Sequence, residues 1–180
     1  MKSLSLPRLT FSALIAAVYA ALTMALGFIS YGPIQFRIAE ALCILPFFLP
    51  FTTWGLFVGC ILSNIISPVG PLDMIFGSLA TLGCCLCVSA LGKRWNGTSW
   101  GTCILACLMP VIWNGVIIGA LLALTAGAEE GAKLALFLLY GAEVAAGELA
   151  VMFILGLPLM RWLPKSKFFP PLRAKLDNAD

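Results

Sequence analysis

The chain has 180 residues, of which 61% are hydrophobic and only 11% are charged, whereas a soluble domain carries about 25% charged residues. This composition excludes a soluble globule. Because one span of the roughly 30 Å hydrocarbon core takes about 20 apolar residues, the length allows about five to seven transmembrane helices. The net charge of +3 is concentrated at the termini and in one central loop, which favours a topology signal over a nucleic-acid site.

The first predicted helix covers residues 9–29, and Gly32 and Pro33 disfavour its continuation. The N-terminal stretch also has the layout of a signal peptide, with basic residues before an apolar run. Because the segments that follow are equally apolar, we expect an uncleaved first helix. The next uncharged run covers residues 41–72 and contains Pro46 and Pro50.

This central run is predicted to be a hairpin of two short helices, residues 34–50 and 53–67. Lys and Arg near helix ends collect on the cytoplasmic side of a membrane, so the N-terminus and the Lys93–Arg94 pair should share that side. An even number of spans must then separate them. The first helix and a helix over residues 73–91 supply two spans, and the hairpin supplies the other two, although each half is short for a 30 Å core.

A fifth helix is predicted over residues 100–124 and a sixth over residues 133–162. The expected fold is therefore an all-α integral membrane protein of the plasma membrane: a six-transmembrane-helix bundle that forms a single transmembrane domain over residues 1–180. Both termini are predicted to be cytoplasmic. Nine of the eleven basic residues then lie on the cytoplasmic side: Lys2, Arg8, Lys93, Arg94, Arg161, Lys165, Lys167, Arg173 and Lys175.

Polar side chains within the predicted spans are candidates for substrate contacts, because each is costly in the bilayer unless it finds a partner. Glu143 and Glu148 point in directions that differ by about 140° on a helix, so we do not expect them to face the same point. Other interpretations stay open: a surface ion pair for Arg37 with Glu40, ordinary packing for Trp113, and an interhelical hydrogen bond or a protonated carboxyl for Glu148. The candidate set is Arg37, Glu40, Asn64, Asp73, Trp113, Asn114, Tyr140, Glu143 and Glu148.

Small residues follow one another along the first predicted helix. Ala13 and Ala17 are four residues apart, and Ala16 and Ala20 lie beside them. Small residues at this spacing let another helix approach closely. The approaching helix can belong to the same chain or to a partner protein, and both interpretations stay open at this point.

The seven cysteines lie in apolar runs and the chain has no histidine, so neither a disulfide framework nor a metal site nor a cofactor is expected. Cys84, Cys85 and Cys87 are interpreted as packing residues. The alternative is a membrane thiol oxidoreductase that uses them. No phosphate-binding loop of the Gly-x-x-x-x-Gly-Lys-Ser/Thr type is present, so we predict a protein that is not an enzyme and whose use of ATP requires another polypeptide.

Three stretches resemble one known family. The run YGPIQFRIAEAL over residues 31–42, followed by LPF over 45–47, resembles the signature region of the QueT family of queuosine-precursor transporters. Asn64 with LDMIFGSL over residues 72–79 is similar to the same family, as is Gly147-Glu148 with LGLP over 155–158. The resemblance covers essentially the whole chain.

This resemblance implies a substrate-binding S component of an energy-coupling factor (ECF) type transporter, an ABC importer, that takes up a 7-deazaguanine: the aminomethyl or cyano form, or queuine. It implies a transmembrane coupling protein and two cytoplasmic ATPases as partners, and docking through Ala13, Ala17, Ala16 and Ala20. A guanine-like edge carries adjacent N–H donors that suit a carboxylate, and Trp113 or Tyr140 could stack on the ring. The alternatives are an S component for riboflavin, thiamine or biotin, and a helix-packing subunit without a ligand.

Overall fold

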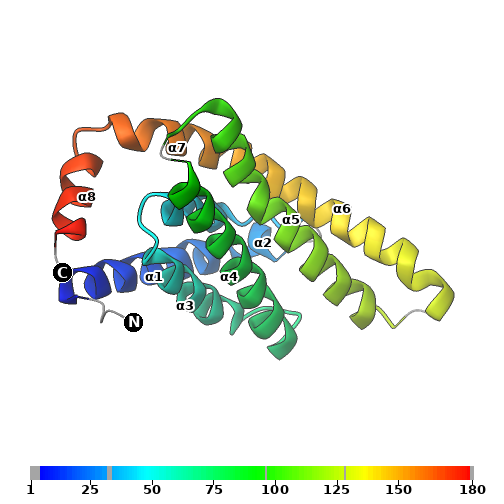
Figure 1. Ribbon diagram of the computed structural model, residues 1–180. Coiled ribbons are helices and arrows are strands. Elements are labelled where there is room, and N and C mark those ends of the chain that lie inside the picture. The colour runs from blue at the N-terminus through cyan, green and yellow to red at the C-terminus, as the bar shows by residue number, and fades with distance from the viewer. Residues whose placement is uncertain (1–4, 32–33, 96, 128, 179–180) are drawn as a thin grey trace.

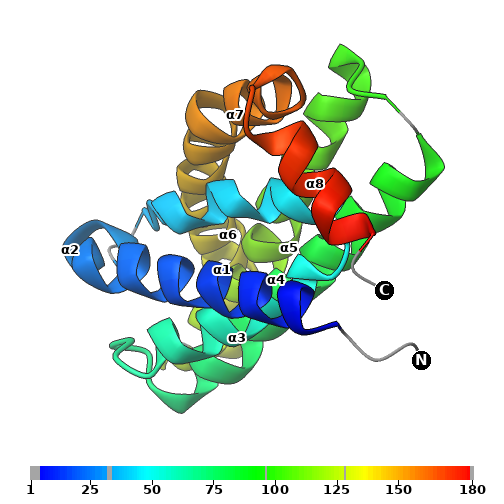
Figure 2. The ribbon, with the colours of Figure 1, turned by 90° about the vertical axis from the view of Figure 1, so that its left-hand side faces the viewer.

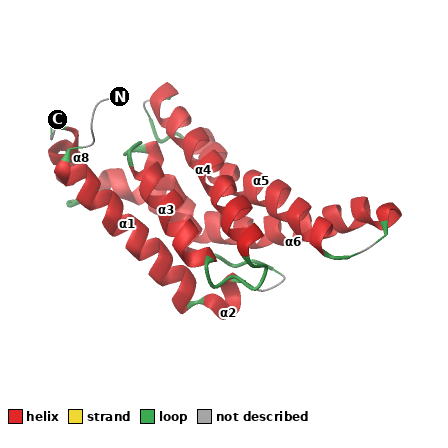
Figure 3. Ribbon diagram, turned by 90° about the horizontal axis from the view of Figure 1, so that it is seen from below, coloured by secondary structure: helices red, strands yellow, loops and turns green. Residues whose placement is uncertain are grey.

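The computed structural model describes residues 5–31, 34–95, 97–127 and 129–178, and within these residues it contains helices and loops but no strand (Figures 1 and 3). The all-helical prediction is therefore confirmed for the described part of the chain. Four helical stretches are long and apolar enough to cross a membrane: Leu6–Ala25, Pro71–Arg94, Trp100–Thr125 and Lys133–Lys165. The predicted helix stop at Gly32 and Pro33 lies outside the described residues.

The first long helix, α1 (Leu6–Ala25), begins with a proline in its first turn, where the missing N–H would have no intrahelical partner. A single further turn, α2 (Gly27–Ser30), follows it. Along its length α1 packs against α3 (Thr52–Asn64), as the view from below also shows (Figure 3). Gly59 makes this close approach possible, because a Cβ there would lie only 2.7 Å from the Ala16 carbonyl oxygen.

The central element is η1 (Ile38–Phe47), which is a 3₁₀ helix rather than the α-helix expected over residues 34–50. Pro46 lies inside it and cannot donate a backbone N–H to an α-helical ladder. At about 2.0 Å per residue, ten 3₁₀ residues reach about as far as the thirteen α-helical residues of α3, roughly 20 Å. η1 contacts all the long helices, and its side chains form the middle of the apolar core.

The helix α4 (Pro71–Arg94) packs between α3 and α5 (Trp100–Thr125) (Figure 1). It starts after Gly70, whose φ of 78° requires a residue without a Cβ, and Asp73 lies in its first turn. Lys93 and Arg94 lie in its last turn, so both ends complement the helix dipole. The start of α5 is capped by Ser99, whose side chain accepts a hydrogen bond from the Thr102 backbone.

The predicted sixth helix is formed by three joined segments that follow the short turn η2 (Glu130–Ala132): α6 (Lys133–Val151), a π-helical turn η3 (Met152–Gly156) and α7 (Leu157–Trp162). The π turn precedes Pro158, which cannot donate to an α-helical bond. α6 runs along α5 as a close pair (Figure 1). A Cβ on Gly119 would lie 2.6 Å from the Gly141 Cα, so this pairing depends on two glycines.

The C-terminal segment folds into η4 (Leu163–Lys165) and α8 (Phe169–Asp177), which the sequence analysis did not predict as helical. α8 lies across the end of the molecule where both chain termini are found (Figure 2). Arg8 of α1 joins it there by donating to the backbone oxygens of Leu176 and Asp177 at 2.8 and 3.0 Å. The described parts of the two chain ends therefore share one end of the bundle.

The outer surface of the bundle is apolar. Large hydrophobic side chains project from each of the long helices, among them Leu14, Val18, Leu79, Leu86, Ile112, Val116, Leu138 and Ile154. A soluble protein does not expose a patch of this extent. This exterior and the buried charges described below are the arrangement expected of an integral membrane protein.

Candidate functional site

Four charged side chains are buried inside the bundle. Arg37 and Asp73 are 1% exposed, and Glu40 and Glu148 are completely enclosed. Ionisable groups are rare inside membrane proteins and are usually held by a partner or by a ligand. These four residues, which come from the start of η1, from α4 and from α6, define the polar cluster of the molecule.

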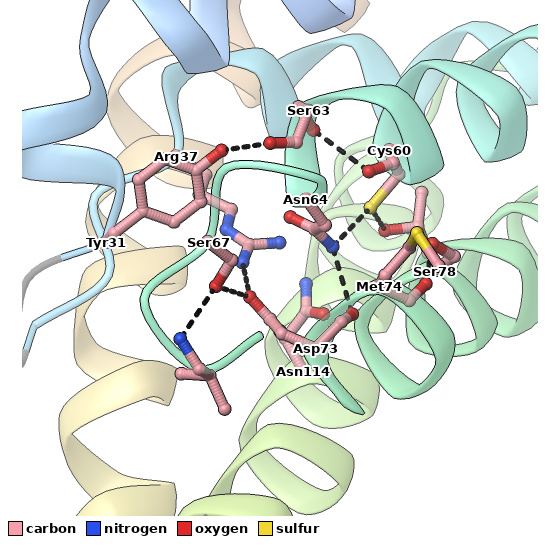
Figure 4. Close-up of polar contacts among 12 residues, drawn as sticks. Tyr31, Arg37, Cys60, Ser63, Asn64, Ser67, Asp73, Met74, Ser78 and Asn114 are labelled. Carbon is pink, nitrogen blue, oxygen red and sulfur yellow. Dashed lines mark hydrogen bonds and ion pairs between the residues drawn. The ribbon is translucent and has the colours of Figure 1, made fainter. Parts of the chain in front are cut away.

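Arg37 forms one half of the polar cluster with Asp73 (Figure 4). The guanidinium Nη2 lies 3.2 Å from Asp73 Oδ2, and the Ser67 hydroxyl donates to the same oxygen at 2.6 Å. Asn64 Nδ2 donates to the Asp73 backbone oxygen at 3.1 Å and so joins the end of α3 to the start of α4. A Cβ on Gly77 would lie 2.7 Å from Asn64 Nδ2 and 2.9 Å from Asp73 Oδ1. This position therefore accommodates the two polar side chains only as glycine.

Glu40 is held by three donors from three different elements. The Tyr19 hydroxyl of α1 donates to Oε1, and the Thr81 hydroxyl of α4 donates to the same oxygen at 3.3 Å. The Cys43 thiol, one turn along η1, donates to Oε2 at 3.0 Å. All three donors are neutral groups, so they orient the carboxylate without supplying a positive charge.

The fourth charged residue of the polar cluster, Glu148, lies where α6 meets α5. Asn114 Nδ2 donates to Glu148 Oε1 at 3.1 Å, and both side chains are buried. Glu148 also lies close enough to Glu40 and Arg37 for electrostatic interaction with both. The interhelical hydrogen bond considered for Glu148 in the sequence analysis is therefore present.

Several buried atoms of this cluster have no hydrogen-bond partner. Leaving a buried polar atom unpaired costs about 1–3 kcal/mol, and more for a charged group, so an accumulation of such atoms in one place requires an explanation. A bound ligand that pairs with them provides one. Four of these atoms are acceptors and one is a donor: Asn64 Oδ1, Asp73 Oδ1, Asn114 Oδ1, Glu148 Oε2 and Arg37 Nε.

An open cleft of about 380 Å³ lies next to the polar cluster, within the size range of small-molecule sites. Its wall includes two tyrosines, one on α6 and one at the end of α2, and the half-buried carboxylate of Glu143. The residues that line it are Tyr31, Gln35, Val69, Leu122, Thr125, Ala126, Tyr140 and Glu143.

Tyr31 and Gln35 join the cleft to the polar cluster. The Tyr31 ring lies 5.7 Å from the Arg37 guanidinium carbon, within cation–π range, and its hydroxyl donates to the Ser63 backbone oxygen at 2.5 Å (Figure 4). Gln35 is buried, and its backbone oxygen would lie 2.7 Å from a Cβ on Gly147 of α6. Tyr31 is therefore tied to α3, and Gln35 packs against α6 just before Arg37.

The structure divides the sequence-predicted site residues into three groups. Six of them are the four charged residues of the polar cluster and the two asparagines that hydrogen-bond to it. Two more line the cleft, and Trp113 lies elsewhere. Its indole faces α4, where a Cβ on Gly83 would lie 2.6 Å from the ring, so Trp113 packs against the apolar core. The cluster group is Arg37, Glu40, Asn64, Asp73, Asn114 and Glu148, and the cleft group is Tyr140 and Glu143.

Sequence reasoning missed three hydroxyl residues. Tyr19 and Thr81 donate to Glu40, and Ser67 donates to Asp73. Hydroxyl residues are common in transmembrane helices, where they bond their own backbone, so Ser67 and Thr81 carry no distinctive pattern. Tyr19 did carry a signal. It is a phenol in the middle of an apolar helix, far from the interfaces where tyrosine is usual.

The alanines of α1 lie on two different faces. Ala16 and Ala20 are buried, and Ala16 lies against Gly59 of α3. Ala13 and Ala17 are exposed on the outer surface. Ala16 and Ala20 therefore serve packing within the chain, as the first interpretation of the small-residue pattern expects. Ala13 and Ala17 leave a free face that a partner protein could contact, as the second expects.

The cysteines belong to the apolar core next to Glu40. The sulfur atoms of Cys43, Cys84 and Cys85 all lie within 4.8 Å of one another, and all three residues are buried. Cys60 accepts hydrogen bonds from Thr81 at 3.3 Å and from Asn64 at 3.4 Å. These cysteines therefore contribute both to packing and to the surroundings of the polar cluster.

Comparison with known proteins agrees with the resemblance found in the sequence. The family described as QueT transporter matches residues 9–165. The queuosine precursor transporter QueT of Lactococcus lactis subsp. cremoris is 44% identical over 72 residues, which is 39% of this chain and 42% of that protein, so the match spans less than half of the relative. No solved structure matches the chain. Because the family match extends from α1 to the end of η4, the chain belongs to the QueT transporter family.

Proposed function

We propose that the protein is the substrate-binding S component of an ECF-type importer for a queuosine precursor, a 7-deazaguanine base. One observation carries this proposal: buried, unpaired polar atoms gather beneath an open cleft in a bundle whose outer surface is apolar. Membership of the QueT transporter family supports the transport role, and the name of the Lactococcus relative, a queuosine precursor transporter, supports the substrate class.

The chemistry of a deazaguanine matches the unpaired atoms. Its ring edge carries an N–H and an amino group, which are donors, and one carbonyl oxygen, which is an acceptor. Asp73 Oδ1 and Asn64 Oδ1 can accept from the donors, and Arg37 Nε can donate to the carbonyl. Tyr31 and Tyr140, which line the cleft, offer aromatic faces along the entry path.

The proposed topology has six membrane segments, α1, η1, α3, α4, α5 and the α6–α7 stretch, with both termini in the cytoplasm. The two ends of α4 support this topology, because the helix begins beside the polar cluster and ends at the basic pair Lys93 and Arg94. Contacts at the other end support it too, since Arg161 donates to the Thr98 backbone oxygen at 2.5 Å and Arg173 lies next to the same loop. The basic end would then face the cytoplasm, and the cleft would open outward from the plasma membrane.

The energy for uptake would come from partner proteins. The sequence has no phosphate-binding loop, so the proposed importer includes a transmembrane coupling protein and two cytoplasmic ATPases. The exposed Ala13 and Ala17 of α1 are the proposed docking face for the coupling protein, because small side chains permit close helix contact.

Calorimetric titration of the detergent-solubilised protein tests the substrate class. The ligands are 7-aminomethyl-7-deazaguanine, 7-cyano-7-deazaguanine and queuine, with guanine and riboflavin as controls. We expect saturable binding of at least one deazaguanine, weakened at least about tenfold by Asp73→Asn, since a hydrogen bond to a charged group contributes about 1.5–3 kcal/mol. Binding of riboflavin but of no deazaguanine by folded protein would overturn the assignment in favour of another vitamin.

A further inference from the structure

We propose that the polar cluster selects a positively charged ligand, with an ammonium group held at Glu148 and Asn114 and an uncharged ring edge held at Arg37, Asp73 and Asn64. This inference rests on the proposed function and adds the charge of the substrate to it. The site thus has an anionic half and a neutral half, which differ in their charges and in their hydrogen bonds.

The charges of the cluster do not balance. Among the described residues, the buried charged side chains are one guanidinium and three carboxyls. Arg37 pairs with Asp73, which leaves Glu40 and Glu148 without a cationic hydrogen-bond partner. An uncompensated buried charge is expensive, so a ligand that supplies a positive charge would be bound in preference to a neutral one.

The two remaining carboxyls differ in their hydrogen bonds. Glu40 receives donors at both oxygens, from Tyr19 and Thr81 at Oε1 and from Cys43 at Oε2. Glu148 receives one donor, from Asn114, and its Oε2 has no partner. Glu148 is therefore the carboxyl that keeps a free oxygen for a ligand, and Glu40 supplies a second negative charge nearby.

The hydrogen-bond donors of an ammonium group match the free acceptor atoms of Glu148 and Asn114. An ammonium has three donors and no acceptor. Glu148 Oε2 and Asn114 Oδ1 are both unpaired and belong to two side chains that touch each other. A group that offers only acceptors, such as a nitrile, could pair with neither Asn114 Oδ1 nor the ionised Glu148 Oε2.

The neutral half faces the ring edge. Arg37 and Asp73 compensate each other, so their free atoms, Nε and Oδ1, can pair with uncharged groups without adding net charge. Asn64 Oδ1 adds a second neutral acceptor next to Asp73. Ring recognition and charge recognition are therefore assigned to different residues, and the two can be separated by mutation.

The test compares two ligands that differ in charge, each measured with the unmodified protein and with a variant that lacks one negative charge. Dissociation constants of the full-length protein are measured by calorimetry for 7-aminomethyl-7-deazaguanine, a cation, and for 7-cyano-7-deazaguanine, which is neutral. We expect the unmodified protein to prefer the cation by at least about tenfold, as one charged hydrogen bond implies. Glu148→Gln should weaken cation binding at least about tenfold and change binding of the neutral ligand less than about threefold.

Glu129→Gln is the matched control, because Glu129 is exposed in the loop before η2 and the substitution removes the same charge. It should leave both dissociation constants unchanged. Glu148→Gln keeps the size of the side chain and the acceptor for Asn114, and thermal unfolding of each variant without ligand checks the fold. Equal affinity of the unmodified protein for both ligands, or an equal loss for both in Glu148→Gln, would overturn the charge assignment, whereas failure of every deazaguanine to bind would overturn the proposed function itself.

Discussion

At the residue scale, the candidate site shows how a few side chains can remain polar inside an apolar bundle. Glu40 is satisfied entirely by neutral donors of the protein, whereas Asp73 and Asn64 each keep one unpaired buried oxygen. The first arrangement gives a fixed structural group, and the second gives a group that can still bind something. Gly77 makes the second arrangement possible by leaving room for both side chains.

We predict that Gly77→Ala weakens binding of 7-aminomethyl-7-deazaguanine by at least about tenfold. Within a helix alanine is normally more stable than glycine by about 1 kcal/mol. Here the added Cβ would lie within 2.7 Å of Asn64 and 2.9 Å of Asp73, so both side chains must move away from their positions. Overpacking of this kind costs about 1–3 kcal/mol. Calorimetry gives the affinity, and thermal unfolding gives the stability.

The control for this substitution is Gly101→Ala at the start of α5, where a Cβ would meet nothing within 4 Å. It should leave the affinity unchanged and maintain or slightly raise the unfolding temperature. If Gly77→Ala bound the ligand as tightly as Gly101→Ala did, the side chains around Gly77 would have no part in ligand binding.

At the element scale, α1 has two small-residue faces with different partners. Ala16 and Ala20 are buried and allow α3 to approach, with Gly59 opposite Ala16. Ala13 and Ala17, on the outer face, have no such neighbour in the bundle and are exposed. A helix built in this way can hold its own fold together on one face while the other stays available to a second protein.

We predict that Ala13→Leu combined with Ala17→Leu prevents assembly with the coupling protein and leaves substrate binding intact. The larger side chains would keep a partner helix from close contact, while the buried face that packs on α3 is unchanged. Co-purification with the coupling protein and the two ATPases measures assembly, and calorimetry measures binding.

Ala135→Leu on α6 serves as the matched control for this pair, because Ala135 is an exposed alanine on a different helix. Assembly should survive that substitution. Normal co-purification of the α1 double variant would remove Ala13 and Ala17 from the docking surface, without bearing on the substrate.

At the scale of the whole molecule, the bundle is polarised from end to end. α8, the start of α1 and the basic residues around Arg161 and Arg173 gather at one end, whereas the start of α4 and the cleft lie toward the other. Positive charge collects on the cytoplasmic side of membrane proteins, so this asymmetry predicts an orientation as well as a number of spans.

We predict that an epitope tag inserted at Gly131 is reached by antibody on intact cells, and that a tag at Gly97 is reached only after permeabilisation. Gly131 lies in the short turn η2 and Gly97 in the loop before α5. Both are exposed, and a Cβ on either would meet nothing within 4 Å, so the insertions should be tolerated. Labelling with the two patterns exchanged would reverse the orientation, and labelling of both tags from outside would contradict the single span, α5, that separates the two positions.

The sequence by itself determined the helical membrane character, the approximate positions of the long helices and the resemblance to a family. Apolar runs about 20 residues long leave little choice of structure in a bilayer, because only helices satisfy their own backbone there. The polar residues in these runs, such as Glu40, Asp73 and Glu148, were visible as candidates for the same reason, since a charge within a span is conspicuous.

Only the tertiary structure decided which of these residues meet and which atoms remain free. Periodicity cannot specify that Tyr19 reaches Glu40, that Trp113 turns toward α4, or that Ala16 and Ala17 serve different faces. These outcomes depend on how the helices rotate and cross, which is set by contacts between different helices, such as Gly59 of α3 against Ala16 of α1 and Gly119 of α5 against Gly141 of α6. In a chain where nearly every residue is apolar, hydrophobic pattern carries little information about rotation, so close packing at small residues makes that choice.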